Sequence, residues 1–167
     1  MKLKVAIVFF LISIPIQTIA QTDCPCCTNA HKQFDFWVGD WGVYDTAGNK
    51  VGENSIVKLE NGCIINEHWR GAAGGSGRSY NYFNKSDSTW NQVWIDSRGG
   101  SLELKGKAVP NKMILSSELQ PGKNVDFYRN RITWTKNEDE SVTQLWEILD
   151  KQDKLLSVAF KGIYKRK

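Results

Sequence analysis

Histidine is scarce in this sequence and occurs only at His31 and His68. A Ser-His-Asp or Cys-His catalytic device needs a histidine beside a nucleophile, with an acid that orients the ring. His68 has no obvious nucleophile beside it, and strand alternation places it on the opposite face from Glu67. Neither a G-x-S-x-G turn nor an H-E-x-x-H helix is present. The motifs therefore predict no catalytic residue, and we expect no cofactor.

The chain also lacks a strong charge of either sign. Its formal net charge is +4, and Lys2 and Lys4 of the N-terminal segment account for two of those charges. A remaining charge of +2, spread along the chain except for a "KRK" tail, is too small to indicate nucleic acid or an anionic membrane as partner. The glycine-rich stretch 71–77 lacks the Lys-Ser/Thr pair and the helix of a phosphate-binding loop, so we interpret it as a hairpin turn.

No hydrophobic run is long enough to span a bilayer comfortably. The first residues read as a secretory signal: "MKLK" is basic, "VAIVFFLISIPI" is apolar, and "TIA" ends on a small residue. We predict a signal peptide over residues 1–20 with cleavage after Ala20, and a secreted or periplasmic protein without stable membrane insertion. An uncleaved anchor is the alternative, whereas Asp23 disfavours lipid attachment at Cys24.

All four cysteines lie beyond the predicted cleavage site, at Cys24, Cys26, Cys27 and Cys63. Outside the cytosol, an even number of cysteines favours disulfides. Three pairings are open, but the clustering of three cysteines favours a bridge from that cluster to Cys63, which ties the N-terminal arm to a strand. With His31, the "CPCC" arm also offers soft ligands for copper(I) or zinc, so metal handling is the alternative.

No amphipathic helical stripe of useful length appears, and short alternating runs separated by turn residues recur instead. We expect a Cys-rich arm over residues 21–33, followed by one all-β domain over residues 34–167. Even spacing of the strands favours an antiparallel up-and-down β-barrel of about ten strands, with an open sandwich as alternative. The predicted strands cover residues 37–45, 52–60, 63–70, 78–83, 89–96, 101–108, 112–119, 125–136, 142–149 and 154–164.

Three of these strands share an unusual face that mixes tryptophan with amide or carboxyl groups. Alternation within the strands places these side chains together on one face: Glu67, Trp69, Gln92, Trp94, Gln144 and Trp146. They either form core with polar neighbours near strand ends, or line a cavity in which indoles supply apolar area and polar groups orient a ligand. Arg131 joins this predicted ligand-binding set if its face of the long strand turns inward.

The stretch "FDFWVGDW" is the other distinctive feature, because it places four aromatic residues among eight positions. Its Gly39-Asp40-Trp41 segment, followed by Val43, resembles the N-terminal signature of lipocalins and other calycins. "GCIINEHWRG", "WNQVWID" and "VTQLWE" make the chain similar to secreted bacterial calycin-like proteins with an FDFWxGxW opening. That resemblance implies a barrel in which the tryptophan packs across one end and which holds a small, often hydrophobic molecule.

Three functional hypotheses follow from these patterns. The first is a secreted or periplasmic protein that binds a small hydrophobic or aromatic molecule. The second is an isomerase or hydrolase of a small metabolite that uses Glu67 as acid or base, with a carboxylate pair between Glu67 and Asp96 also conceivable. The third is metal handling through the "CPCC" arm.

Overall fold

The computed structural model describes residues 24–167. The predicted signal peptide and the start of the Cys-rich arm lie outside the described residues. Within residues 24–167, no helix is long and apolar enough to cross a membrane.

The described chain is built almost entirely of β-strands. Three short 3-10 helices, η1 (Ala30–Lys32), η2 (Asp35–Trp37) and η3 (Glu60–Gly62), lie before β1 and between β2 and β3. The strands are β1 (Gly39–Tyr44), β2 (Lys50–Leu59), β3 (Ile64–Gly71), β4 (Ser76–Asn84), β5 (Thr89–Asp96), β6 (Ser101–Val109), β7 (Lys112–Ser116), β8 (Gln120–Pro121), β9 (Phe127–Lys136), β10 (Val142–Asp150) and β11 (Leu155–Arg166).

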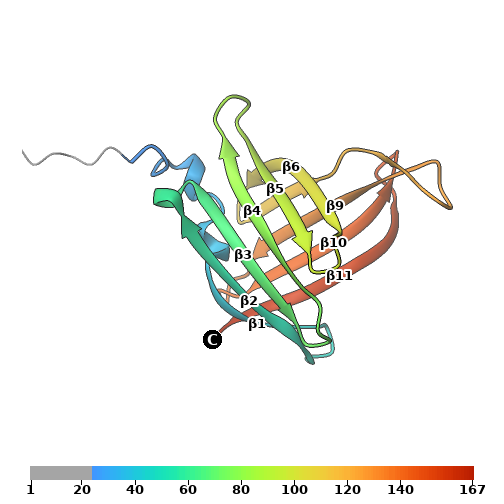
Figure 1. The fold of residues 1–167 in the computed structure, drawn as a ribbon, viewed down its shortest axis with the longest axis horizontal. Coiled ribbons are helices and arrows are strands. Elements are labelled where there is room, and N and C mark those ends of the chain that lie inside the picture. The colour runs from blue at the N-terminus through green and yellow to red at the C-terminus, as the bar shows by residue number, and fades with distance from the viewer. Residues whose placement is uncertain (1–23) are drawn as a thin grey trace, which may run out of the picture.

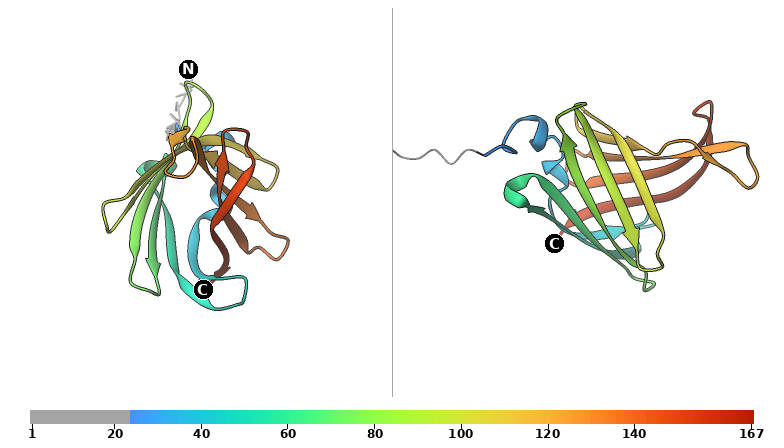
Figure 2. Two further views of the ribbon diagram at one scale, coloured as in Figure 1. Left: turned by 90° about the vertical axis from the view of Figure 1, so that its right-hand side faces the viewer. Right: turned by 45° about the horizontal axis from the view of Figure 1, so that its top comes forward.

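Ten of these strands form a closed antiparallel barrel, as predicted. The hydrogen-bonded order runs from β10 through β11 and β1 to β7 and then to β9, and a β9–β10 pairing closes the ring (Figures 1 and 2). Closure pairs the strand edges that an open sandwich would leave free. The hydrophobic core lies inside the barrel and is dominated by aromatic side chains toward the end that carries the short helices.

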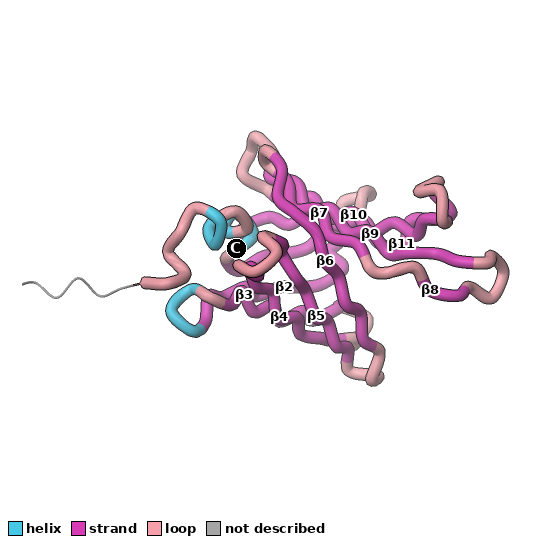
Figure 3. The backbone as a smooth tube through the Cα atoms, turned by 90° about the horizontal axis from the view of Figure 1, so that it is seen from above, coloured by secondary structure: helices cyan, strands magenta, loops and turns pink. Residues whose placement is uncertain are grey.

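The structure differs most from the sequence prediction at three places. Trp37 belongs to η2 rather than to the first strand, because the backbone turns back with Trp37 N donating to Phe34 O and Val38 N to Asp35 O. The seventh strand ends at Ser116, three residues early. The two-residue strand β8 was not predicted; it pairs only with β9, at the end of the barrel opposite the short helices (Figure 3).

The "FDFWVGDW" stretch closes one end of the barrel. Phe34, Trp37 and Trp41 are fully buried. The Phe34 ring stacks on Trp37 with a centroid distance of 4.9 Å and meets the edges of Trp90 and Trp134 at 5.7 and 5.2 Å. These five residues are called the aromatic plug below. Three of the four aromatic residues of this stretch are fully buried in the barrel end, which indicates that the stretch closes the barrel rather than binds a ligand.

Gly39 and Trp41 explain why the first strand opens with a G-x-W pattern. Gly39 has φ of +143°, which disfavours any other residue, and a β-carbon there would lie 2.4 Å from the Arg166 guanidinium. That guanidinium covers the Trp41 ring at 4.5 Å, while Trp41 Nε1 donates to Trp37 O at 2.9 Å. The glycine therefore allows the last strand's arginine to lie over the tryptophan.

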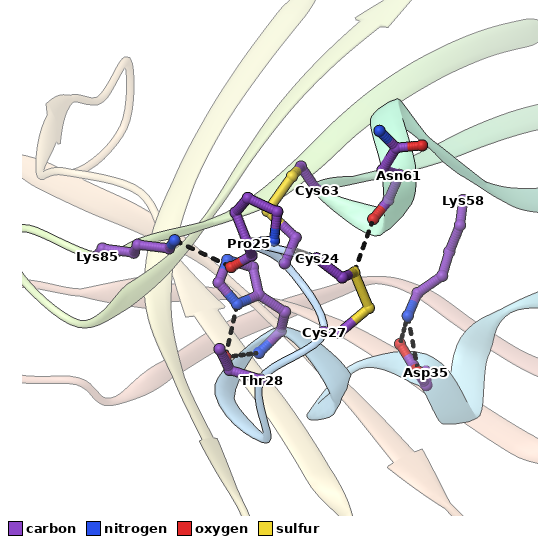
Figure 4. The surroundings of a disulfide bond; sticks show 11 residues. Cys24, Pro25, Cys27, Thr28, Asp35, Lys58, Asn61, Cys63 and Lys85 are labelled. Atoms are coloured by element: carbon purple, nitrogen blue, oxygen red, sulfur yellow. Dashed lines mark hydrogen bonds and ion pairs between the residues drawn. A yellow bond between two sulfur atoms is a disulfide. The ribbon is translucent and has the colours of Figure 1, made fainter. Parts of the chain in front are cut away.

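Two disulfides fasten the N-terminal arm. Cys26 pairs with Cys63 at the start of β3, and Cys24 pairs with Cys27 (Figure 4). The predicted bridge from the cluster to Cys63 is confirmed, and no free cysteine is present among residues 24–167. Lys58 of β2 also forms an ion pair with Asp35 of η2 at 2.6 Å. The arm is thus fixed to the barrel by the Cys26–Cys63 bond, and the η2 segment that follows it is held by the ion pair.

Candidate functional site

A layer of polar side chains crosses the barrel interior just above the aromatic plug. The layer takes one or two residues from each of six strands, and every member is at most 9% exposed. We call it the polar belt; its members are Asn54 (β2), Glu67 (β3), Ser79 and Asn81 (β4), Gln92 (β5), Gln144 (β10) and Tyr164 (β11). Such a layer is unusual for a core, since buried polar groups need partners to avoid a desolvation cost of about 1–3 kcal/mol each.

Hydrogen bonds join the β3–β5 part of the belt. Gln92 Nε2 donates to Asn81 Oδ1 at 2.7 Å, and Asn81 Nδ2 donates to Ser79 Oγ at 2.9 Å. The Ser79 hydroxyl then donates to Glu67 Oε2 at 2.7 Å. Glu67 is therefore the acceptor at the end of this chain.

The rest of the belt reaches Glu67 from the other side. Asn54 Nδ2 donates to Glu67 Oε1 at 2.6 Å and lies 3.5 Å from the Tyr164 hydroxyl, which donates to Gln144 Oε1. Among the described residues, no hydrogen bond is assigned to Gln92 Oε1 or to Gln144 Nε2. Both of these residues line the cavity described next, so each has a polar atom left for a ligand or water.

A cavity of about 230 Å³ lies above the belt. It is larger than the roughly 150 Å³ apolar cavity that accommodates benzene, and smaller than the roughly 300 Å³ at which sites for drug-sized ligands begin. Four aromatic rings form its upper wall: Trp69 (β3), Trp94 (β5), Trp146 (β10) and Phe160 (β11). These four residues are called the aromatic rim. Three of them lie two positions beyond a belt residue on the same strand, because alternate residues face inward.

Inward-facing glycines let two rim indoles lie against the barrel wall. A β-carbon on Gly52 would be 2.4 Å from Trp69 Cη2, and one on Gly77 would be 2.3 Å from Trp94 Cζ2. Each indole thus occupies the space that a side chain on the neighbouring strand would take. Glycine inside a strand often marks such a close approach, and here it keeps the rings out of the cavity.

Glu67 is the only carboxyl group that lines the cavity among the described residues. Burial raises the pKa of Glu67 from 4.5 to about 6, although the bonds from Asn54 and Ser79 favour the charged form. Burial and the neighbouring Glu67 charge raise the pKa of Tyr164 well above 10, so Tyr164 stays neutral and can donate its proton to a hydrogen bond. At neutral pH the belt therefore holds one negative charge.

Glu67 makes stability depend on pH in a defined direction. Its pKa is higher in the folded protein than in the unfolded chain, so its stabilising contribution is full below about pH 4.5 and is lost as the pH rises through about 6. The difference corresponds to about 2 kcal/mol. Wild type is expected to lose about this much stability relative to Glu67→Gln between pH 4.5 and 7, measured by urea unfolding. Parallel pH curves for the two proteins would show that this carboxyl is not desolvated.

Six of the seven sequence-predicted ligand residues line this one cavity: Glu67, Trp69, Gln92, Trp94, Gln144 and Trp146. Arg131 does not. It directly precedes Ile132, which lines the cavity, so alternation turns Arg131 to the outer face of β9. There its Nε and Nη2 donate to Glu147 Oε2 at 3.1 and 3.0 Å.

Sequence reasoning missed the belt residues of β2, β4 and β11. On β4 the burial alternates, with Gly77, Ser79 and Asn81 inward, while Tyr80 and Tyr82 are 46% and 41% exposed. The strand is thus polar inside and aromatic outside, the reverse of the usual pattern. The sequence carries no local signal for this inversion, because the polar side of β4 follows from its pairing with β3 and β5.

The remaining chemical candidates lie away from the cavity. His68 is on the outer face, as alternation predicts, where Arg70 and Arg78 lie within 3.2 Å of its Nδ1. His31 is buried beside Phe83 and bonds the Thr28 hydroxyl at 2.7 Å. Asp96 accepts backbone N–H bonds within the β5–β6 turn rather than pairing with Glu67.

The thiolates required for metal handling are consumed in the two disulfides. A group of three or more metal-ligating side chains is not found within the described part of the chain. Comparison with protein-family models finds no match, and comparison with curated proteins finds none either.

Proposed function

We propose that this barrel binds a small, partly apolar molecule in the cavity between the polar belt and the aromatic rim. One observation carries the proposal: tryptophan and amide or carboxyl pairs from β3, β5 and β10 converge on a single cavity. A mostly apolar pocket with a few convergent polar groups is the usual composition of a small-molecule site. The unbonded amide atoms of Gln92 and Gln144 favour a ligand with a polar end directed at the belt.

We also propose that the protein is exported from the cytosol. Two disulfides are typical of proteins that fold in an oxidising compartment. Together with the predicted signal peptide, they support a secreted or periplasmic binding protein of calycin-like type. In such a compartment the cavity would meet ligands from outside the cell or from the periplasm.

A second candidate function is proton transfer by Glu67. The raised pKa of this carboxyl inside a cavity favours it, because a general base works best with a pKa near the working pH. Catalysis requires that a bound compound is chemically altered. Incubation of each binding compound with the protein, followed by NMR of the compound, decides between the two: an unchanged spectrum after a day supports binding alone.

The binding proposal is tested by titrating the protein with aromatic and alicyclic compounds of up to about ten heavy atoms, a size matched to the cavity. Contact with rim indoles is expected to quench tryptophan fluorescence. Absence of any response across such a panel would contradict the proposal.

A matched pair of glycine variants tests whether the ligand binds in this cavity. Gly77→Ala must displace the Trp94 ring from the wall, since its β-carbon would lie 2.3 Å from Cζ2, and it must also shift the Ile95 carbonyl oxygen, which would lie at 2.8 Å. We expect at least about fivefold weaker binding, with a loss of stability of about 1–3 kcal/mol. Gly75→Ala in the same hairpin meets no atom within 4 Å and should bind like wild type. Equal affinity for both variants would place the ligand elsewhere.

A further inference from the structure

We propose that the ligand of this cavity is a small organic cation, a protonated amine that carries a flat apolar group. The inference rests on the proposed function and names the chemical class that the same site selects. It follows from the charge of the cavity, from the balance of hydrogen-bond donors and acceptors on the belt, and from the aromatic rim.

The cavity carries negative charge without a positive partner. Among the described residues that line it, Glu67 and Tyr164 alone are titratable, and none is a lysine, arginine or histidine. The strands packed against Glu67 supply only neutral groups: Asn54 from β2, Ser79 from β4 and Tyr164 from β11. An anionic ligand such as a carboxylate or phosphate would therefore face a like charge with no base to offset it.

A cationic ligand would supply the positive charge that Glu67 lacks as a partner. Taking a carboxylate out of water is unfavourable unless a countercharge accompanies it. Burial raises the pKa of Glu67 to about 6, so its ionised form still predominates at pH 7.5. An ammonium group placed against Glu67 would form a hydrogen bond between two opposite charges, which adds a Coulombic attraction that the neutral donors Asn54 and Ser79 do not supply.

The hydrogen-bond acceptors that remain free on the belt also favour a ligand with N–H donors. Gln92 Oε1 lines the cavity as an acceptor with no assigned donor within residues 24–167, and each Glu67 oxygen accepts only one assigned hydrogen bond, so it has capacity for a second. Gln144 Nε2 is the one lining donor of the belt left without an assigned acceptor in the described structure. A head group rich in N–H donors matches this surface better than a carbonyl or an ether.

The aromatic rim fits the rest of such a ligand. Indole faces attract cations more strongly than other aromatic side chains do, and three of the four rim residues are tryptophan. Rim rings also provide flat apolar surface for an aryl or cycloalkyl group. The volume of about 230 Å³ suits a single ring with a short amine-bearing chain.

A charge series with one ring tests the inference: 2-phenylethylamine, 2-phenylethanol and 3-phenylpropionate, titrated at pH 7.5 by calorimetry. The amine is expected to bind at least about tenfold more tightly than the alcohol, and the carboxylate is expected not to bind. Glu67→Gln should abolish the preference for the amine and change the affinity for the alcohol less than about threefold. These margins correspond to one charge-assisted bond.

A pH series on the wild-type protein provides a test that does not depend on whether the Glu67→Gln variant folds. The preference for amine over alcohol should fall close to tenfold between pH 7 and 5, as Glu67 takes up a proton. Equal or tighter binding of the alcohol at pH 7.5, an amine preference that survives in Glu67→Gln, or an amine preference in wild type that does not fall between pH 7 and 5 would overturn the inference while the proposed function stands. Failure of all three probes, with no quenching by the wider panel, would overturn both.

Discussion

Replacing Trp37 with alanine is expected to lower the free energy of unfolding by about 3–5 kcal/mol. Trp37 is fully buried, stacks on Phe34 at 4.9 Å and lies 5.3 Å from the Trp134 ring. Removing the indole leaves a cavity in the middle of the aromatic plug, which the surrounding rings, held by several strands, fill only in part. Equilibrium unfolding in urea measures the loss.

The same variant tests whether the "FDFWVGDW" stretch closes the barrel or binds a ligand. Trp37 does not line the cavity, so Trp37→Ala should keep its ligand affinity within about twofold, a change of only about 0.4 kcal/mol. Trp94→Ala is the matched control, because it removes a rim indole and should weaken binding much more than it destabilises the fold. A Trp37→Ala protein that remains stable but loses binding would show that this stretch grips a ligand.

Removing the Cys26–Cys63 disulfide in the double variant Cys26→Ser/Cys63→Ser is expected to cost about 4 kcal/mol of stability. The bond joins residues 37 apart in sequence, and closing a loop of that length restricts the unfolded chain strongly in the chain-entropy model. It also holds the arm that leads into the aromatic plug. Urea unfolding of the oxidised proteins, without reductant, provides the comparison.

The second disulfide supplies the control for this effect. Cys24 and Cys27 are only three residues apart, so Cys24→Ser/Cys27→Ser should cost about 1.5 kcal/mol by the same reasoning. Equal losses for the two double variants would show that loop closure is not the source of the stabilisation. Detection of free thiols in the denatured, unreduced wild-type protein would contradict the pairing itself.

Much of the fold was predictable because alternation is a local property. A period of two in segments such as "TWNQVWID" and "VTQLWEIL" identifies both the strands and the residues that share a face. This information was sufficient to group Glu67 with Trp69 and Gln92 with Trp94. Local periodicity also located the strand containing Arg131, but it did not fix which face of that strand turns inward.

The polar belt was not predictable, because it depends on register between strands. Asn54 lies opposite Trp69 and close to Glu67 only through the β2–β3 pairing, and Tyr164 reaches Gln144 only through the register of the β10–β11 pairing. On β4, hydrophobicity alone would place the tyrosines in the barrel interior, yet they face outward. The polar interior there has no local hydrophobic signal; it follows from its neighbours on β3 and β5.

The most direct test of the cavity as a ligand site uses the seven tryptophan indole N–H signals in a proton–nitrogen NMR spectrum. Three indoles belong to the aromatic rim, at Trp69, Trp94 and Trp146, and the other four lie in the aromatic plug. On titration with 2-phenylethylamine at pH 7.5, we predict that the three rim signals shift and that the plug signals hold their positions. Shifts confined to the plug indoles would contradict binding between the belt and the rim, and so would the absence of any indole shift with every compound of the wider panel.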